Sequence, residues 1–199
     1  MVKKPLLIMM LLALFAPWAA NAQQALPYSY GFENNNLATD GWAQQAHYNY
    51  ESGISYAGSN SHGGAYLFRF QYSENPGYLI SPLLTGTNNG VDLEFYYANY
   101  SSSFNEKFQV GYTTDENVTN PSAFTYGAEI TCQTIAPSYA KYENTFPAGT
   151  KRIAIKYIYT NGHYLYLDDF CFTAHVSCPM PSGLAATLTP GNGTVATLN

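Results

Sequence analysis

The chain has 199 residues, of which 46% are hydrophobic, 16% aromatic and only 11% charged, and its formal net charge is −5. This length is enough to bury the core of one medium-sized domain. The acidic balance and the absence of a Lys/Arg cluster argue against nucleic acid or an anionic membrane surface as a partner. The 19 Tyr residues favour strands over helices, because aromatic side chains suit a half-buried pleated surface.

The first 22 residues predict a secretory signal peptide rather than a part of the fold. Lys3 and Lys4 give a positive start, residues 6–16 form an apolar core, and Ala20-Asn21-Ala22 is a small-x-small cleavage pattern. The apolar core is shorter than the roughly 20 residues that a membrane-spanning helix needs. We therefore expect cleavage after Ala22 and a secreted or cell-surface protein with no membrane insertion afterwards. An uncleaved membrane anchor is the alternative.

Strand signals then recur at short spacing, separated by Gly, Asn, Pro and Ser. Alternation is clear where Val91, Leu93 and Phe95 share one face, and again where Ile153 and Ile155 share one face. One apolar and one polar face per strand predicts an all-β domain, an antiparallel β-sandwich of two sheets packed face to face. No helical periodicity of useful length follows residue 22. The predicted strands are 28–33, 42–50, 65–72, 78–81, 91–97, 107–113, 128–132, 141–146, 152–160 and 164–172.

Residues 176–199 differ in character from the predicted sandwich. Residues 178–184 have the pattern of an extended linker that enters a new strand, and residues 194–198 would form the next strand. One hairpin has too little apolar surface to be stable alone. We therefore expect this segment to be a linker and the truncated start of a second domain.

The chain has three cysteines, Cys132, Cys171 and Cys178. Disulfides are permitted in an exported protein, and an odd number leaves at least one cysteine without a partner in this chain. We expect a Cys132–Cys171 disulfide, because Cys178 lies in the predicted linker and can pair with a partner beyond this chain.

Carboxylates at the two ends of the sandwich are the candidate metal ligands. The first and last strands of such sandwiches often lie side by side, which would bring Glu33 close to Asp168 and Asp169. Acids brought together either bind a cation such as calcium or repel each other. Neighbouring residues of a strand point to opposite faces, so Asp168 and Asp169 both face one ion only if the strand bends or bulges. The alternative is that these acids accept hydrogen bonds from loop amides and hold this end of the sandwich closed.

Several aromatic side chains are candidates for a flat platform that binds a sugar ring or a peptide. Aromatic rings offer a large contact area at a low cost in side-chain entropy. Core packing is the alternative, especially for Trp42 and Tyr97. The candidate platform residues are Trp42, Tyr48, Tyr50, Tyr96, Tyr97 and Tyr100.

No enzymatic motif is found in the sequence. Gly-x-Ser-x-Gly, His-Glu-x-x-His, Cys-x-x-Cys and a phosphate-binding loop are all missing. Asp92 and Glu94 share one face of a strand, as a pair of glycosidase carboxylates could. Acids on an alternating strand are more often simply solvated, so we expect no catalytic residues in this chain.

The order of several motifs resembles a known family. Phe32-Glu33 is followed by Gly41-Trp42, by Gly-Tyr-Leu-Ile-Ser-Pro at residues 77–82, and finally by Leu-Asp-Asp-Phe at residues 167–170. Over residues 27–173 this order resembles the cleaved-adhesin or choice-of-anchor J jelly-roll domains of Bacteroidetes surface proteins, which are similar in fold to MAM domains. The tail resembles the start of a fibronectin type III domain. The expected organisation is a signal peptide (1–22), a jelly-roll domain (23–175) and a linker with a truncated fibronectin type III-like start (176–199).

The resemblance implies a secreted or cell-surface, non-catalytic adhesion module that binds a carbohydrate or a host protein. It also implies a structural calcium ion at positions that match Glu33 and Asp168. One alternative is an accessory binding module of a larger secreted protease or glycoside hydrolase. A jelly-roll glycanase is a third hypothesis.

Overall fold

The computed structural model describes residues 22–45, 52–72, 76–158 and 162–176. The predicted signal peptide up to residue 21, Tyr48, Tyr50, and the predicted linker and second-domain start from residue 177 lie outside the described residues. Within the described ranges, no helix is long and apolar enough to cross a membrane.

Regular structure in the described ranges consists of strands and three short 3-10 turns. In chain order these elements are β1 (Gln23–Ala25), β2 (Tyr28–Tyr30), η1 (Ala38–Asp40), β3 (Ala43–Gln45), β4 (Gly53–Tyr56), η2 (Gly58–Asn60), β5 (Tyr66–Gln71), β6 (Gly77–Ile80), β7 (Leu83–Thr85), β8 (Val91–Asn99), β9 (Lys107–Thr113), η3 (Pro121–Ala123), β10 (Thr125–Tyr126), β11 (Ile130–Thr131), β12 (Ala140–Phe146), β13 (Arg152–Ile158) and β14 (Tyr164–Ala174).

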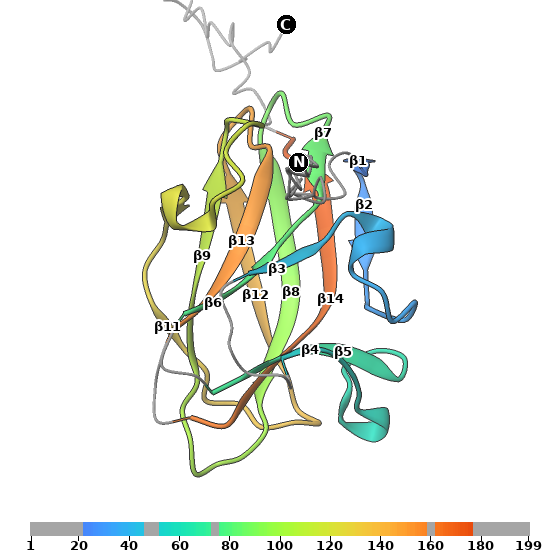
Figure 1. The fold of residues 1–199 in the computed structure, drawn as a ribbon, viewed down its shortest axis with the longest axis vertical. Helices are drawn as coiled ribbons and strands as arrows, with labels where there is room; N and C mark the ends of the chain where they lie inside the picture. The colour runs from blue at the N-terminus through green and yellow to red at the C-terminus, as the bar shows by residue number, and fades with distance from the viewer. Residues whose placement is uncertain (1–21, 46–51, 73–75, 159–161, 177–199) are drawn as a thin grey trace, which may run out of the picture.

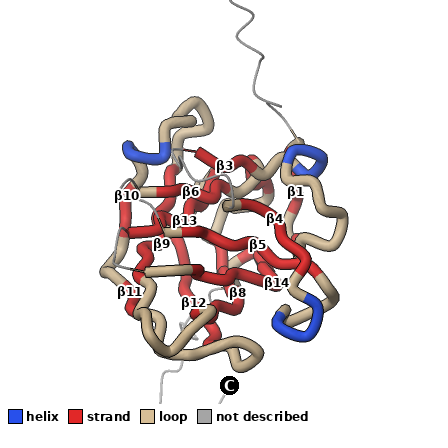
Figure 2. The backbone as a smooth tube through the Cα atoms, turned by 60° about the horizontal axis from the view of Figure 1, so that its bottom comes forward, coloured by secondary structure: helices blue, strands red, loops and turns tan. Residues whose placement is uncertain are grey.

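The strands form two six-stranded antiparallel sheets that pack as a sandwich (Figures 1 and 2). The first, which we call the β14 sheet, has the order β12-β8-β14-β5-β4, and β2 also pairs with β14. The second, the β13 sheet, has the order β10-β9-β13-β6-β3, and β11 also pairs with β9. A short parallel pair joins β1 to β7. The all-β antiparallel sandwich predicted from the sequence is therefore confirmed.

The core fills the space between the two sheets, and it follows from the two-residue alternation of the strands. Val91, Leu93 and Phe95 of β8 are at most 2% exposed. Burying one such side chain stabilises the fold by roughly 1.5–3 kcal/mol. Strands of the facing sheet add Phe108, Val110, Ile153, Ile155 and Tyr157 to the same cluster. The neighbouring strand β14 of the same sheet adds Leu165, Leu167, Phe170 and Phe172.

The first and last predicted strands lie side by side, as expected, with Tyr30 of β2 opposite Phe170 of β14. β2 ends at Tyr30 rather than at the predicted residue 33. Phe32 has a φ of 63° and Asn35 a φ of 53°, which an extended strand does not accommodate. Glu33 therefore lies in the loop that follows β2.

The predicted Cys132–Cys171 disulfide is not formed, because both cysteines are free thiols. Cys132 follows β11 in the β13 sheet and is fully buried in the core. Cys171 lies on β14 between Phe170 and Phe172, whose side chains enter the core, so its own side chain points out of the opposite sheet. The prediction that Cys171 lies in the last strand is correct. Its side chain lies on the outer face of the sheet, whereas Cys132 is buried between the sheets, so the two thiols do not meet.

Candidate functional site on the outer face of the β14 sheet

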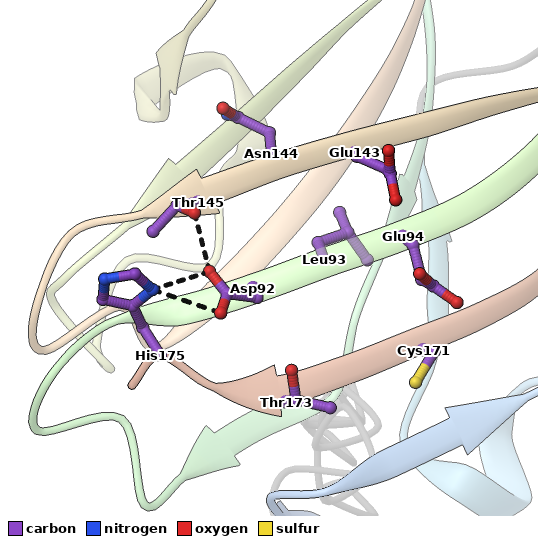
Figure 3. Close-up of a pocket in the computed structure, with 9 residues that line it drawn as sticks. All are labelled: Asp92, Leu93, Glu94, Glu143, Asn144, Thr145, Cys171, Thr173 and His175. Carbon is purple, nitrogen blue, oxygen red and sulfur yellow. Dashed lines mark hydrogen bonds and ion pairs between the residues drawn. The ribbon is translucent and has the colours of Figure 1, made fainter. Parts of the chain in front are cut away.

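The outer face of the β14 sheet carries an open hollow of about 710 Å³, which we call the acidic groove. Its side chains come from three adjacent strands, because the outward positions of β8 stand opposite outward positions of β12 and β14. In this register Asp92 faces both Thr145 and Thr173, while Glu94 faces both Glu143 and Cys171. The groove is lined by Asp92, Leu93, Glu94, Glu143, Asn144, Thr145, Cys171, Thr173 and His175 (Figure 3).

Asp92 is held from both neighbouring strands. Its Oδ1 accepts a hydrogen bond from Thr145 Oγ1 at 2.6 Å, and His175 Nδ1 lies 2.9 Å from Oδ1 and 3.1 Å from Oδ2 (Figure 3). A carboxylate beside Nδ1 favours the proton on that nitrogen, so the other ring nitrogen remains available to a ligand. Asp92 thereby orients an imidazole and a hydroxyl at one end of the groove.

Two like charges stand directly opposite each other at the next position of the sheet. Glu94 and Glu143 are cross-strand partners, an arrangement that is destabilising by itself. Lys141 offsets the repulsion, because its Nζ lies 2.6 Å from a carboxylate oxygen of each. The hydrogen bonds to Glu143 and Glu94 raise the pKa of the Lys141 ammonium above its usual range. The groove therefore presents carboxylates in fixed positions at an accessible surface.

A second hollow of about 420 Å³ adjoins the groove and shares Glu94 and Cys171 with it. It extends over the edge of β2 towards the point where β14 is irregular. Its remaining lining consists of Ser29, Tyr30, Gly31, Tyr96, Asp169 and Phe170.

β14 bulges between Asp168 and Cys171, where its pairing with β8 shifts. Asp169 has a φ of 48°, so the alternation of side chains is broken there. Asp168 Oδ2 accepts the backbone N–H groups of His62 (2.9 Å) and Gly63 (3.2 Å), and Asp169 Oδ2 lies 2.6 Å from His62 Nδ1. Asp168 and Asp169 were expected to face one site only if the strand bent or bulged. The strand does bulge, and both acids contact the loop that precedes β5.

Glu33 also contacts the segment that leads into β5. Its carboxylate accepts the N–H groups of Ala65 at 3.1 Å and Tyr66 at 2.9 Å. We call Glu33, Asp168 and Asp169 the acidic junction. Gly64 has a φ of 60°, and a β-carbon there would overlap the Glu33 carboxylate, so the loop fits the junction only with glycine at this position.

Asp168 is fully buried in the acidic junction. Burial, and then the neighbouring Asp169, raise the pKa of Asp168 to about 7, although the N–H groups of Gly63, Asp169 and His62 oppose that shift. The described residues contain no group of three or more His, Cys, Asp or Glu side chains arranged to hold a metal ion. The contacts of the junction are those of the hydrogen-bonding alternative, and calcium stays a prediction.

Trp42 is a core residue and not part of a binding platform. It is only 3% exposed, its ring stacks on Tyr30 with centroids 5.4 Å apart, and its Nε1–H donates to the Tyr28 hydroxyl at 2.8 Å. Tyr97 packs against the core in the same way, with its ring 5.0 Å from that of Phe108. Both side chains therefore pack with the inward-facing aromatic rings, as the core-packing alternative describes.

Tyr96 and Tyr100 do not lie in the core but are in different parts of the outer surface. The Tyr96 ring stacks on the His62 ring at 3.6 Å and lines the smaller hollow. Tyr100 is 50% exposed and lies beyond the end of β8. The predicted platform is thus divided among the core, the groove margin and the far end of the sheet.

Several residues of the site were not singled out from the sequence, namely His62, Lys141, Glu143, Thr145 and His175. Alternation in the predicted strand at 141–146 carries a signal for Lys141, Glu143 and Thr145, because all three occupy the polar face. No local signal places His62 beside Asp169, since 107 residues separate them.

Comparison with known proteins identifies the fold through solved structures. No family model matches the sequence, and no curated protein sequence matches it. The K1 and K3 cleaved adhesin domains of Lys-gingipain from Porphyromonas gingivalis match with TM-scores of 0.64 and 0.63, and the K2 domain matches with 0.61. The sequence identities are 21%, 18% and 21%, and the matches cover 75%, 75% and 73% of this chain and 98% of each domain. The chain therefore has the fold of these cleaved adhesin domains, as the order of its motifs predicts.

Proposed function

We propose that this domain is a non-catalytic, extracellular or cell-surface binding module, whose ligand is a glycan or an extracellular protein. The acidic groove is the observation that carries the proposal. It is an open hollow of about 710 Å³ whose polar side chains come from three strands and lie on the face of the sheet that does not form the core.

The chemistry of the groove suits a ligand that is rich in hydrogen-bond donors. Carboxylates are strong acceptors for hydroxyl and ammonium groups, and a few fixed polar groups are what give a binding site its specificity. Asp92 and Glu94 already engage His175, Thr145 and Lys141, so they are held in place before a ligand arrives. Carboxylates that are already paired with neighbouring side chains suit a recognition surface better than they suit the acid pair of a glycoside hydrolase.

The structural comparison supports the same proposal. The similar structures are described as cleaved adhesin domains, and they come from Lys-gingipain. A second candidate function is therefore an accessory binding module of a larger secreted protease or glycoside hydrolase, in which this domain holds the substrate while another domain acts on it.

The test is binding of the secreted chain to arrays of glycans and of extracellular proteins. The double variant Asp92→Asn/Glu94→Gln should lose binding, while Glu116→Gln, an exposed acid on the loop after β9, should keep it. Release of reducing sugar or peptide by the wild-type chain would overturn the non-catalytic assignment. If a ligand binds the double variant as tightly as it binds the wild type, its binding site lies outside the groove.

We also propose a structural calcium ion at the acidic junction. The support is the bulge of β14, because it turns Asp168 and Asp169 towards the loop that Glu33 holds. Carboxylates and backbone carbonyls are the oxygen ligands that calcium prefers, and a cation would relieve repulsion among three acids. Glu33, Asp168 and Asp169 are the residues that would hold it.

A further inference from the structure

The outer edge of β12 is a free edge of the β14 sheet. β12 pairs with β8 on one side, and no strand of the described ranges pairs with its other side. β12 has seven residues, which is the length of an ordinary strand. The peptide groups on the unpaired side of an edge strand can pair with a strand of another chain, so such an edge is a template for binding.

Three residues of β12 direct their backbone N–H and C=O groups to this free edge. Asn99 of β8 exchanges backbone hydrogen bonds of 2.8 and 3.0 Å with residues 134–136, which precede β12, so the odd-numbered residues of β8 pair on the β12 side. The even-numbered residues of β12 stand opposite them and use their peptide groups within the sheet. The peptide groups of Lys141, Glu143 and Thr145 therefore point away from β8, and all three residues are exposed to solvent.

An open hollow of about 400 Å³, which we call the edge hollow, lies beside this free edge. It is formed between β12 of one sheet and the segment with β10 and β11 of the other, which lie on the same side of the sandwich (Figure 2). Tyr112, Ile130 and Tyr142 line the edge hollow, and each is only partly buried against the core. Apolar side chains of a ligand can therefore pack against the core at this place.

The edge hollow and the acidic groove meet at β12, because Glu143, Asn144 and Thr145 line both. Successive side chains of a strand point to opposite faces. A strand added to the free edge would therefore place one set of side chains in the edge hollow and the other set beside the acidic groove. On that side it would meet the carboxylates of Asp92, Glu94 and Glu143 (Figure 3).

We propose that the free edge of β12 binds an extended segment of another extracellular protein, in which apolar residues alternate with lysine or arginine. The backbone of this segment pairs with the peptide groups of Lys141, Glu143 and Thr145, and its apolar side chains fill the edge hollow. Its basic side chains lie beside the carboxylates of the acidic groove, which supply the complementary charge. The inference rests on the proposed binding function, and it names the partner chemistry and the mode of binding.

Charge favours a basic partner over a second copy of this chain. Antiparallel pairing of two β12 edges about Glu143 would place two glutamates directly opposite each other, which is destabilising, and each chain carries a net charge of −5. A glycan has no peptide groups in strand register, so it would not use the outward groups of the edge.

The test uses the full secreted chain and a fluorescently labelled, end-capped heptapeptide of alternating lysine and valine, with fluorescence anisotropy as the readout. Two control peptides separate charge from pattern. One has glutamate in place of lysine, and the other has the same composition with the lysines and the valines in separate blocks. The alternating lysine peptide should bind at least about tenfold more tightly than either control, and added salt should weaken it.

A pair of variants at Glu143 separates the backbone contribution from the charge. Glu143→Gln removes only the carboxylate and should weaken peptide binding about threefold. Glu143→Pro also removes the outward N–H, which does not pair with β8, so it should weaken binding about tenfold further while the protein stays folded. The melting temperature and the circular dichroism spectrum check the fold.

A second pair of variants tests the edge hollow without touching β12, and it decides the question if Glu143→Pro fails to fold. Ala128 is exposed and lines the edge hollow, so Ala128→Trp should fill it and weaken peptide binding about tenfold. Ala123→Trp is the matched control, because Ala123 is also exposed but does not line the hollow. Its binding should equal that of the wild type.

The proposal is overturned if the alternating lysine peptide binds no more tightly than its controls, or if Ala128→Trp and Ala123→Trp bind it equally. A dimer of the wild-type chain that Glu143→Pro separates into monomers would assign the edge to a second copy and also overturn it. An array ligand that Asp92→Asn/Glu94→Gln loses but Ala128→Trp keeps would leave the proposed function standing without strand addition at β12.

Discussion

The β14 sheet carries two groups of three carboxylates on one face, the acidic junction and the acids of the acidic groove. In the junction, Asp168 is fully buried, and Asp168 and Glu33 accept backbone N–H groups of one loop. In the groove, Asp92 and Glu94 keep 41% of their side-chain surface, and their partners are other side chains. The same residue types therefore hold the fold together in one place and present a binding surface in the other. The burial of Asp168 and the backbone partners of Asp168 and Glu33 make the difference.

The largest expected effect is the pH dependence of the junction. In metal-free protein, the Asp168 carboxyl titrates near its ordinary value of 3.8 when unfolded and at about 7 when folded. Between these values the folded state keeps a proton that the unfolded state has released. Raising the pH from about 4 to about 7 should therefore lower the free energy of unfolding, by at most about 4 kcal/mol.

Urea denaturation at a series of pH values, with chelator present, measures this loss. Asp168→Asn does not titrate at this position, so its stability should vary much less over the same range. Asp92→Asn, in the groove, should keep the wild-type slope. A wild-type protein whose stability rises from pH 4 to pH 7 would contradict the buried, protonated Asp168.

The fit of the loop to the junction should be the next largest effect. Gly64→Ala places a side chain at a φ of 60° and against the Glu33 carboxylate, so it should cost about 3 kcal/mol through strain and lost hydrogen bonds. Gly149→Ala is the control, because Gly149 has a φ of 79° but no atom within 4 Å of a β-carbon. That variant should cost only about 1 kcal/mol. Equal losses, measured by urea denaturation, would mean that the carboxylate contact contributes nothing.

Calcium should act on the junction and not on the groove. An ion that binds only the folded state stabilises it by roughly 2.7 kcal/mol at a hundredfold excess over Kd. Chelation should lower the melting temperature, calcium should restore it better than magnesium, and Asp168→Asn should lose most of this response. Asp92→Asn should respond as the wild type does. If a demonstrably metal-free sample melts at the same temperature with and without calcium, the junction acts only through its hydrogen bonds.

The sequence predicts the fold well where alternation is regular. The predicted strand 107–113 coincides with β9, and the neighbouring positions of β2 and β14 follow from their places at the ends of the sandwich. β4 was not predicted, because Gly-Ile-Ser-Tyr is short and begins with glycine, a weak strand former.

The candidate site is less accessible to sequence reasoning, because its features depend on contacts that are distant along the chain. The bulge at Asp169 depends on the backbone taking a φ of 48°, and the Asp-Asp pair gives no sign of it. Trp42 entered the core because the rings around it face inward, a property that its residue type does not reveal. The acids could be selected from the sequence, but their division into a junction and a groove required the three-dimensional arrangement.

The smallest expected effect on stability belongs to the groove, where Asp92→Asn should change the free energy of unfolding by less than about 1 kcal/mol. Asp92 keeps 41% of its side-chain surface, and exposed ion pairs are screened by solvent and salt. The same variant should weaken ligand binding on the arrays, because it withdraws the carboxylate that orients His175 and Thr145. Urea denaturation and array binding on one preparation measure both properties. A loss of stability as large as that of Gly64→Ala would mean that Asp92 is structural, and the contrast between junction and groove would then fail.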